Sequence, residues 1–446
     1  MTNVKQAHSA NRFHVGLESF NPQRRSFMTS AARGLLGVSC AAMLQHRAML
    51  PLAMAAEAMP PTAGKAQSVI YLYMNGAMSH LDTFDPKPGS SSQGETKAAQ
   101  TKVPGLAISD KFERLAALTD KLAIVRSLTT TTGAHEQGKY IMHTSYKQLN
   151  SIRHPALGAW AAHALPKANA NLPPNVLIGS AAGHPGAGFL PAAIAPVPVT
   201  NAAVGLENTQ SPSYLTDSQF RKRMSLAREF DEAFKRRYDS SNEVKAYDET
   251  YREAVKLMGS SELKVFDIKE EKEEVRKYYG ENALGQGCLL ARRLVQRGVR
   301  FVEVEFGSWD HHQDIFTRVG DMVSKLDMAL SALIRDLESK GLLEQTLIVL
   351  ATEFGRTPAI NENAGRDHHP GVFSGVLCGA GIRRGAVYGT SDAKGAAPDE
   401  DPVAVEDFNA TIARAMGLPL DKDFIAPNGR PFRICNEGKP IDKLIA

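Results

Sequence analysis

The sequence predicts an α/β fold, a doubly wound and mostly parallel sheet with helices on both faces and a helical insertion. Two observations carry this prediction. Short apolar runs end abruptly in turn residues, and amphipathic segments lie between them. A repeated alternation of strand and helix implies a parallel sheet that is covered on both faces. The chain has 446 residues, of which 43% are hydrophobic and 22% charged, enough for a sizeable core.

The strands are predicted from continuous apolar runs, which are typical of strands buried on both faces. The first, Ser68–Met74, is ended by Asn75 and Gly76. The remaining runs are Leu122–Val125, Val299–Phe306, Thr346–Ala351 and Ser374–Cys378.

Three segments have the apolar spacing of helices that pack on a sheet. They are Gly285–Arg297, Phe316–Lys340 and Val405–Met416. Residues 217–280 are instead dense in Lys, Arg, Glu and Asp, which predicts a charged helical insertion. Such a stretch is usually an exposed surface, although it can also shape the mouth of a site.

The N-terminal residues resemble a targeting sequence rather than part of the folded domain. Arg24 and Arg25, followed by Ser-Phe-Met, resemble the twin-arginine export signal. A weakly apolar run and small residues suited to cleavage follow. We therefore expect a Tat signal peptide at 1–56, a linker at 57–66 and a single domain at 67–446, with the mature protein in the periplasm or at the cell surface. The alternative is an amphipathic N-terminal helix that stays attached.

Charge and cysteine content exclude several classes of protein. The net charge of +4 arises from 52 basic and 48 acidic residues, which argues against nucleic acid as a partner. The cysteines Cys40, Cys288, Cys378 and Cys435 form no CxxC pair, so a zinc ribbon or redox dithiol is not expected. The mature chain contains no predicted membrane span. Protein partners and oligomeric state are not predicted.

Carboxylates and imidazoles follow several of the predicted strands, where ligands bind in doubly wound sheets. Candidate metal ligands are His80, Asp82, Asp310, His312, Glu353, Asp367 and His368. Mixed His, Asp and Glu ligands suit zinc, manganese or iron, and calcium is a further candidate. The pattern therefore predicts a divalent metal site.

Several of these segments resemble the DUF1501 family. The matching stretches are 75–87, 285–297, Trp309-Asp310, 353–358, 365–368 and 429–431. The resemblance runs from about residue 20 to the C-terminus. It implies an alkaline-phosphatase-like domain, because this family is grouped with the alkaline phosphatase and sulfatase superfamily, whose members use divalent metals to hydrolyse phosphate or sulfate esters.

Compared with the metal-ligand pattern of this superfamily, Asp310 with His312 resembles one ligand pair, and His368 falls where the last histidine is expected. Glu353 and Phe354 replace an Asp-His, so one histidine ligand is missing, and Asp367 or His369 are candidates to replace it. His135 occupies the nucleophile position.

The roles of the catalytic candidates stay open. We rank the role of His135 as a metal ligand first and as a nucleophile second. A histidine at this position can also mean that the ester hydrolase activity has been lost. Thr132 is an alternative nucleophile at a helix start. The resemblance places Lys139 at the arginine position of the sulfatase motif. Arg356 can clamp a substrate anion or pair with a buried carboxylate.

Three further histidines, His143, His154 and His163, are predicted to be surface or helix-packing residues, and Trp309 to pack beneath the site. Three functions follow from the resemblance. The first is an exported metal-dependent hydrolase of small-molecule or polymer phosphate or sulfate esters. The second is a catalytically silent binding protein at the cell surface, which the altered nucleophile position favours. The third is a metal-dependent isomerase or mutase.

Overall fold

The computed structural model describes residues 64–207 and 242–446, with a few single residues and short segments between. The expected signal peptide, most of the linker and much of the charged insertion lie outside the described residues. Among the described residues, no helix is both long enough and apolar enough to span a membrane.

A 9-stranded sheet forms the centre of the described chain, in the order β12-β4-β11-β8-β1-β7-β5-β6, with β15 pairing with β4. Its strands are β1 Ser68–Met74, β4 Leu122–Thr129, β5 Asn175–Ile178, β6 Val197–Val199, β7 Phe301–Phe306, β8 Thr346–Ala351, β11 Phe373–Gly379, β12 Ala386–Tyr388 and β15 Val403–Ala404. The predicted mostly parallel sheet is confirmed, since every described pair in it is parallel except those of β11.

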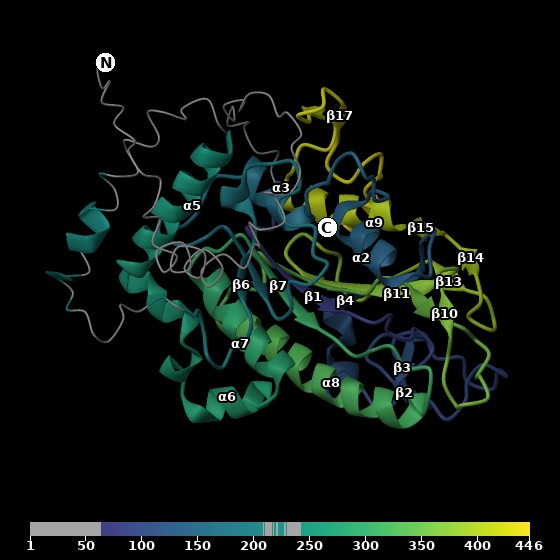
Figure 1. The fold of residues 1–446 in the computed structure, drawn as a ribbon. Helices are drawn as coiled ribbons and strands as arrows, with labels where there is room; N and C mark the ends of the chain where they lie inside the picture. Colours follow the sequence, from purple (N-terminus) through teal and green to yellow (C-terminus); the bar gives the residue numbers. More distant parts are fainter. Residues whose placement is uncertain are drawn as a thin grey trace, which may run out of the picture.

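Helices cover both faces of this sheet, and Figure 1 shows α7 and α8 on one side and α2, α3 and α9 on the other. The helices with described bounds are α2 His135–Thr144, α3 Leu157–Ala164, α5 Asn242–Met258, α6 Glu273–Tyr279, α7 Ala283–Gln296, α8 Ile315–Ser339 and α9 Val405–Met416. Short 3-10 helices are η2 Leu115–Lys121, η3 Ala192–Ile194, η4 Ser261–Phe266, η5 Ile268–Glu270 and η6 Asp442–Leu444.

Four two-stranded sheets lie outside the central one. They pair β2 Ala98–Gln100 with β3 Ala107–Ser109, β9 Gly355–Arg356 with β10 His368–His369, β13 Thr390–Ser391 with β14 Pro398–Glu400, and β16 Phe424–Ile425 with β17 Pro431–Phe432. The β9–β10 hairpin matters most for function because it follows β8 directly.

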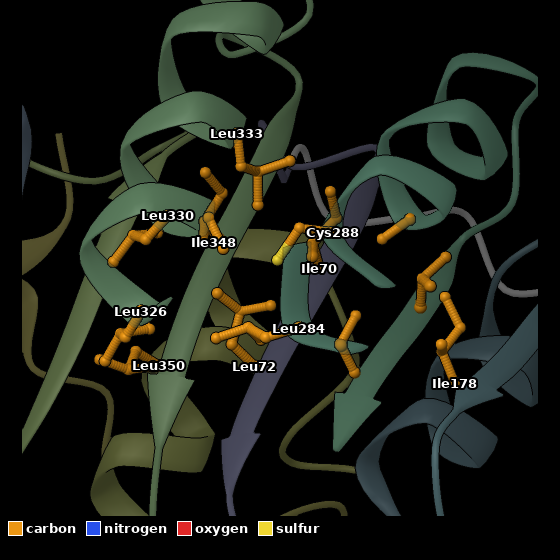
Figure 2. Packing of buried hydrophobic residues seen from close by; sticks show 14 of the residues in the cluster. Ile70, Leu72, Ile178, Leu284, Cys288, Leu326, Leu330, Leu333, Ile348 and Leu350 are labelled. Atoms are coloured by element: carbon orange, nitrogen blue, oxygen red, sulfur yellow. The ribbon is translucent and has the colours of Figure 1, made fainter. Parts of the chain in front are cut away.

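Strand β1 separates two hydrophobic clusters, because successive side chains of a strand point to opposite faces. Ile70 and Leu72 join the cluster under α7 and α8, whereas Val69 and Tyr71 join the cluster on the other face. Figure 2 shows the first cluster, in which Leu326, Leu330 and Leu333 of α8 and Leu284 and Cys288 of α7 cover β1 and β8. Each fully buried leucine of this kind contributes roughly 2 kcal/mol to stability.

One strand of this mostly parallel sheet is antiparallel to its neighbours. β11 runs antiparallel to both β4 and β8. The segment between β8 and β11 contains the β9–β10 hairpin and no helix. A parallel return needs a crossover, usually a helix, so this connection brings the chain back in the opposite direction.

Parallel pairing brings the ends of three central strands to one edge of the sheet. Met74 of β1 lies in register with Phe306 of β7, and Tyr73 with Ala351 of β8. The segments after these strands begin side by side. They carry Gly76, Asp310 and Glu353 respectively.

Candidate metal centre

Four side chains from three segments converge at this edge of the sheet. Asp310 and His312 follow β7, His135 is the first residue of α2, and His368 lies in the β9–β10 hairpin. The Nε2 atom of His368 lies 3.1 Å from Nε2 of His135 and 3.0 Å from Nε2 of His312. We call these four residues the metal-ligand cluster.

The carboxylate of Asp310 completes the cluster. Its Oδ2 lies 3.3 Å from Nε2 of His135, and its Oδ1 lies 3.0 Å from Nε2 of His312 and 3.2 Å from Nε2 of His368. Ligand atoms that share one ion at bonds of about 2.1 Å lie roughly 3.0–3.4 Å apart. His135, Asp310 and His368 form a set that can hold one ion, with His312 beside it.

The other nitrogen of each histidine is engaged by an oxygen acceptor. Nδ1 of His368 donates to the carbonyl of Gly133 at 2.7 Å. Nδ1 of His135 lies 2.7 Å from Oε1 of Glu353, and Nδ1 of His312 lies 3.0 Å from Oδ1 of Asp367. With protons on Nδ1, the three Nε2 atoms present lone pairs to one another and to Asp310, an arrangement that a cation between them would stabilise. This pattern of oriented imidazoles is typical of metal ligands.

Glu353 is fully buried behind His135, with 0% of its side chain exposed. It also accepts hydrogen bonds from the backbone N–H of Gly76 at 2.8 Å and from the hydroxyl of Tyr73 at 2.9 Å. Burial alone would raise the pKa of Glu353, but the hydrogen bonds from His135 and from backbone N–H groups outweigh it and lower the pKa. Glu353 thus orients His135 as an anion and does not face the cluster centre.

Arg356 is fully buried and holds Asp310 in place. Its guanidinium donates to Oδ1 of Asp310 at 2.6 Å and to the carbonyls of Gly76 and Ala77. Partial burial would raise the pKa of Asp310, but the hydrogen bond and charge of Arg356, with smaller contributions from His368 and His135, hold the pKa well below its usual range. Of the two roles open for Arg356, the structure supports pairing with a carboxylate.

The cluster is accessible from solvent, since 43% of the Asp310 side chain is exposed. The first turn of α2 also lies here, because His135 opens that helix. N–H groups in a first turn lack intrahelical partners and favour anions. A cation site beside a helix N-terminus suits an anionic ligand.

Two candidate ligands lie away from the cluster. Asp82 forms a buried ion pair with Arg366 and accepts from Ser79 and Thr96. His80 is buried, and its Nε2 donates to the carbonyl of Gly395 at 2.9 Å. Their partners stabilise the loop after β1, so we do not include them among the proposed ligands.

Two catalytic candidates are also engaged elsewhere. Lys139 donates to Oε2 of Glu305 at 2.8 Å and to the carbonyl of Ala182. Thr132 donates to Oε1 of Gln137 and accepts from the N–H of Ala134. Neither is proposed to bind substrate or to attack it. His369 donates to the carbonyl of Ala396, and Trp309 is buried and packs against Phe306 at the end of β7.

The sequence reasoning missed the orienting role of Glu353 and a second buried group, Glu303 with His143 and His184. The sequence does contain a sign of this buried group, because Glu303 and Glu305 interrupt an otherwise apolar strand. His143, expected at the surface or in helix packing, is buried within that group.

Residues 66–445 match the family described as "Protein of unknown function (DUF1501)". The chain belongs to the DUF1501 family. The metal-ligand cluster of this DUF1501 protein lies entirely within the matched residues. No curated protein shows significant sequence similarity to the chain.

Solved structures superpose on this DUF1501 chain only distantly. The lipoteichoic acid synthase LtaP from Listeria monocytogenes has a TM-score of 0.37 and 9% identity, covering 81% of this chain and 74% of that one. A sulfatase from Pseudoalteromonas sp. has a TM-score of 0.36 and 14% identity, covering 84% and 73%. A phosphonate monoester hydrolase from Silicibacter pomeroyi has a TM-score of 0.35 and 10% identity, covering 84% and 76%. Such low scores do not bear on the reaction of this chain.

Proposed function

We propose that this protein is an exported hydrolase of phosphate or sulfate esters that uses one divalent metal ion. The observation that carries the proposal is the convergence of three Nε2 atoms and one carboxylate, each oriented from behind by a hydrogen-bond partner. The ester class comes from the resemblance of the site segments to the alkaline phosphatase and sulfatase superfamily. Export rests on the twin-arginine motif at Arg24 and Arg25.

The donor set fits a metal because three Nε2 atoms and a carboxylate face one another. The proposed ligands are His135, Asp310 and His368, with His312 as a fourth. Bound there, a divalent cation would supply Lewis acidity toward an ester oxygen and toward water. The guanidinium of Arg356 lies 2.6 Å from Asp310 and 3.5 Å from Nε2 of His312. This fixed positive charge disfavours a second cation, so we propose one ion.

The chain's own residues would act by orientation. Glu353 keeps Nε2 of His135 aimed at the cluster and increases the basicity of the ring. Arg356 keeps Asp310 ionised and fixes its carboxylate. The N-terminal turn of α2 would stabilise the negative charge of a phosphoryl or sulfuryl group, since its N–H groups point out of the helix.

His135 is better suited to ligation than to nucleophilic attack. Its Nδ1 is engaged by Glu353, and its Nε2 faces His368 and Asp310 within the proposed ligand set rather than open space for a substrate. A nucleophilic imidazole needs a free nitrogen facing the substrate. We therefore propose that water is the attacking group.

A catalytically silent binding protein is the second candidate. Two observations favour it, since Lys139 is paired with Glu305 and Thr132 is hydrogen-bonded to Gln137. Neither side chain is then available for ester chemistry. On this reading the cluster would hold a metal that binds an anionic polymer without cleaving it.

The deciding experiment is an ester assay on full-length protein that has been stripped by a chelator and reloaded with zinc, manganese or calcium. An aryl phosphate and an aryl sulfate serve as substrates. We expect metal-restored hydrolysis of at least one, and a loss of at least about 100-fold in His368→Ala and Asp310→Asn. Asp423→Asn, in an exposed pair with Arg433, is the matched control. Metal binding without turnover of either ester would overturn the hydrolase in favour of the binding protein.

A further inference from the structure

A second polar group is buried on the α2 side of the sheet. Glu303 of β7 contacts His143 in the last turn of α2 and His184 in the segment after β5. All three are buried. Isolated buried charges cost several kcal/mol each, so such a group must satisfy itself internally.

The hydrogen bonds determine where its protons lie. Nδ1 of His143 donates to the carbonyl of Lys139 at 2.7 Å, and its Nε2 lies 2.8 Å from Oε1 of Glu303. Nδ1 of His184 accepts from the N–H of Gly186 at 3.0 Å. His184 therefore carries its proton on Nε2, which faces Oε2 of Glu303 at 3.2 Å.

One further proton must lie between His143 and Glu303. A carbonyl cannot donate, so Nδ1 of His143 is protonated. Without another proton, the lone pair on its Nε2 would face a carboxylate oxygen at hydrogen-bonding distance. Burial would lower the pKa of His143, but the charge and hydrogen bond of Glu303 outweigh it and raise the pKa. His143 and Glu303 thus form an imidazolium–carboxylate pair.

The same geometry argues against a metal ion at this group, although three potential ligands are present. A histidine that binds a metal through Nε2 carries its proton on Nδ1. In His184 that proton would face the N–H of Gly186, and two donors would oppose each other. The 2.8 Å contact of His143 with Glu303 is a hydrogen bond.

The titratable groups around this trio are either neutral or paired with other partners. The rings of Tyr71 and Tyr73 pack against His143, and burial raises the pKa of both phenols, so they stay neutral. Lys139 lies nearby and lowers the pKa of His143, but it is itself paired with Glu305. Glu353 contacts the hydroxyl of Tyr73, and the buried thiol of Cys435 lies near Tyr71.

We propose that His143, Glu303 and His184 form a proton-dependent lock that ties α2 to β7 and so holds His135 in the metal-ligand cluster. His135 and His143 lie at opposite ends of the same ten-residue helix. The statement about His135 rests on the proposed function, whereas the lock itself does not.

The lock has a defined pH dependence. The pKa of His143 is raised in the folded protein, so its contribution to stability is fully present below the unfolded pKa. That contribution is lost as the pH rises through the folded pKa. Above that pH, neutral His143 has one N–H for two acceptors, Oε1 of Glu303 and the carbonyl of Lys139. One of these hydrogen bonds is then lost, and the tie between α2 and β7 is weakened.

The variant Glu303→Gln distinguishes a proton-dependent lock from a metal site at this buried group. The amide N–H₂ can donate to Nε2 of neutral His143, and the amide oxygen can accept from His184, so no dissociable proton remains. Chelator-treated full-length protein is unfolded in urea at a series of pH values above the ordinary histidine pKa of about 6.5. We expect the unfolding equilibrium constant of the wild type to rise by up to tenfold per pH unit between the unfolded and the folded pKa of His143 and to level off above the folded pKa, and that of Glu303→Gln to lack this rise.

An equal rise of the unfolding constant with pH in Glu303→Gln would overturn the lock, as would the loss of one bound metal equivalent in that variant. If Glu303→Gln does not fold, ¹⁵N-histidine NMR of the metal-free wild type decides. One imidazole that stays doubly protonated above pH 7 supports the lock, and its absence contradicts it. The unfolding comparison needs no bound metal, so an empty metal-ligand cluster would refute the proposed function and leave the lock testable.

Discussion

Nδ1 of His135 lies 2.7 Å from Oε1 of Glu353, a carboxylate with no exposed surface at the end of β8. This contact joins the first residue of α2 to the central sheet. It fixes both the orientation and the basicity of the imidazole that faces Asp310 and His368. The position of α2 therefore determines the geometry of the metal-ligand cluster.

Glu353→Gln tests the negative charge without changing the shape of the side chain. The amide oxygen can still accept from His135 and Gly76, and the amide nitrogen can donate to Tyr73. We expect metal affinity to fall by about 10–100-fold, as is usual when an orienting partner is altered. A competition titration with a chromogenic chelator measures this. Glu344→Gln, in an exposed pair with Arg384, should bind metal like the wild type.

Asp367→Asn should have a smaller effect on the same titration. Asp367 orients His312, but 58% of its side chain is exposed and water can replace it. Exposed pairs contribute about 0–1 kcal/mol, so the expected loss of affinity is roughly five-fold or less. A larger loss than that of Glu353→Gln would mean that His312, and not His135, is the dominant ligand.

Gly76→Ala should damage the site through the backbone. Gly76 has φ +112°, and an added Cβ would lie 2.7 Å from the backbone nitrogen of Asp310. Gly89 also has positive φ, at +80°, with nothing within 4 Å of an added Cβ. Gly89→Ala should cost about 1–3 kcal/mol of unfolding free energy, and Gly76→Ala should cost more and weaken metal binding. Equal costs in urea unfolding would show that the close approach to Asp310 is unimportant.

The buried His80 should make the stability of the folded protein sensitive to acid. Burial lowers its pKa from 6.5 to about 4. The unfolded chain therefore binds an extra proton in this range, and stability is lost as the pH falls from 6.5 toward 4, by up to about 1.4 kcal/mol per pH unit. His80→Gln, which can still donate to Gly395, should make the pH dependence of unfolding shallower by up to that amount. An unchanged slope would count against this assignment.

Strong apolar patterns made most of the fold predictable. The predicted segments Ser68–Met74, Thr346–Ala351 and Val405–Met416 coincide with β1, β8 and α9. No comparable apolar pattern marks β5 and β6, because they have only four and three residues and β6 contains Pro198. The antiparallel direction of β11 depends on a connection without a crossover helix, which apolar periodicity does not reveal.

The site was predictable in its residue types and less so in its roles. The structure brings Asp310, His312, His368 and His135 together because the predicted strands end at the same edge. Spacing alone could not distinguish a residue that faces the cluster from one that supports it, as the position of Glu353 shows. Asp82 follows β1 as a ligand would, but its burial against Arg366 depends on the distant hairpin segment.

The metal content of full-length protein tests the central claim most directly. Elemental analysis after gentle purification, followed by titration of chelator-treated protein, should give one equivalent of a divalent metal in the wild type and in Asp423→Asn. His368→Ala and Asp310→Asn should contain less than about a tenth of an equivalent while keeping the far-UV circular dichroism of the wild type. A folded wild type that neither contains nor rebinds zinc, manganese, iron or calcium would contradict the account, as would variants that retain the full equivalent.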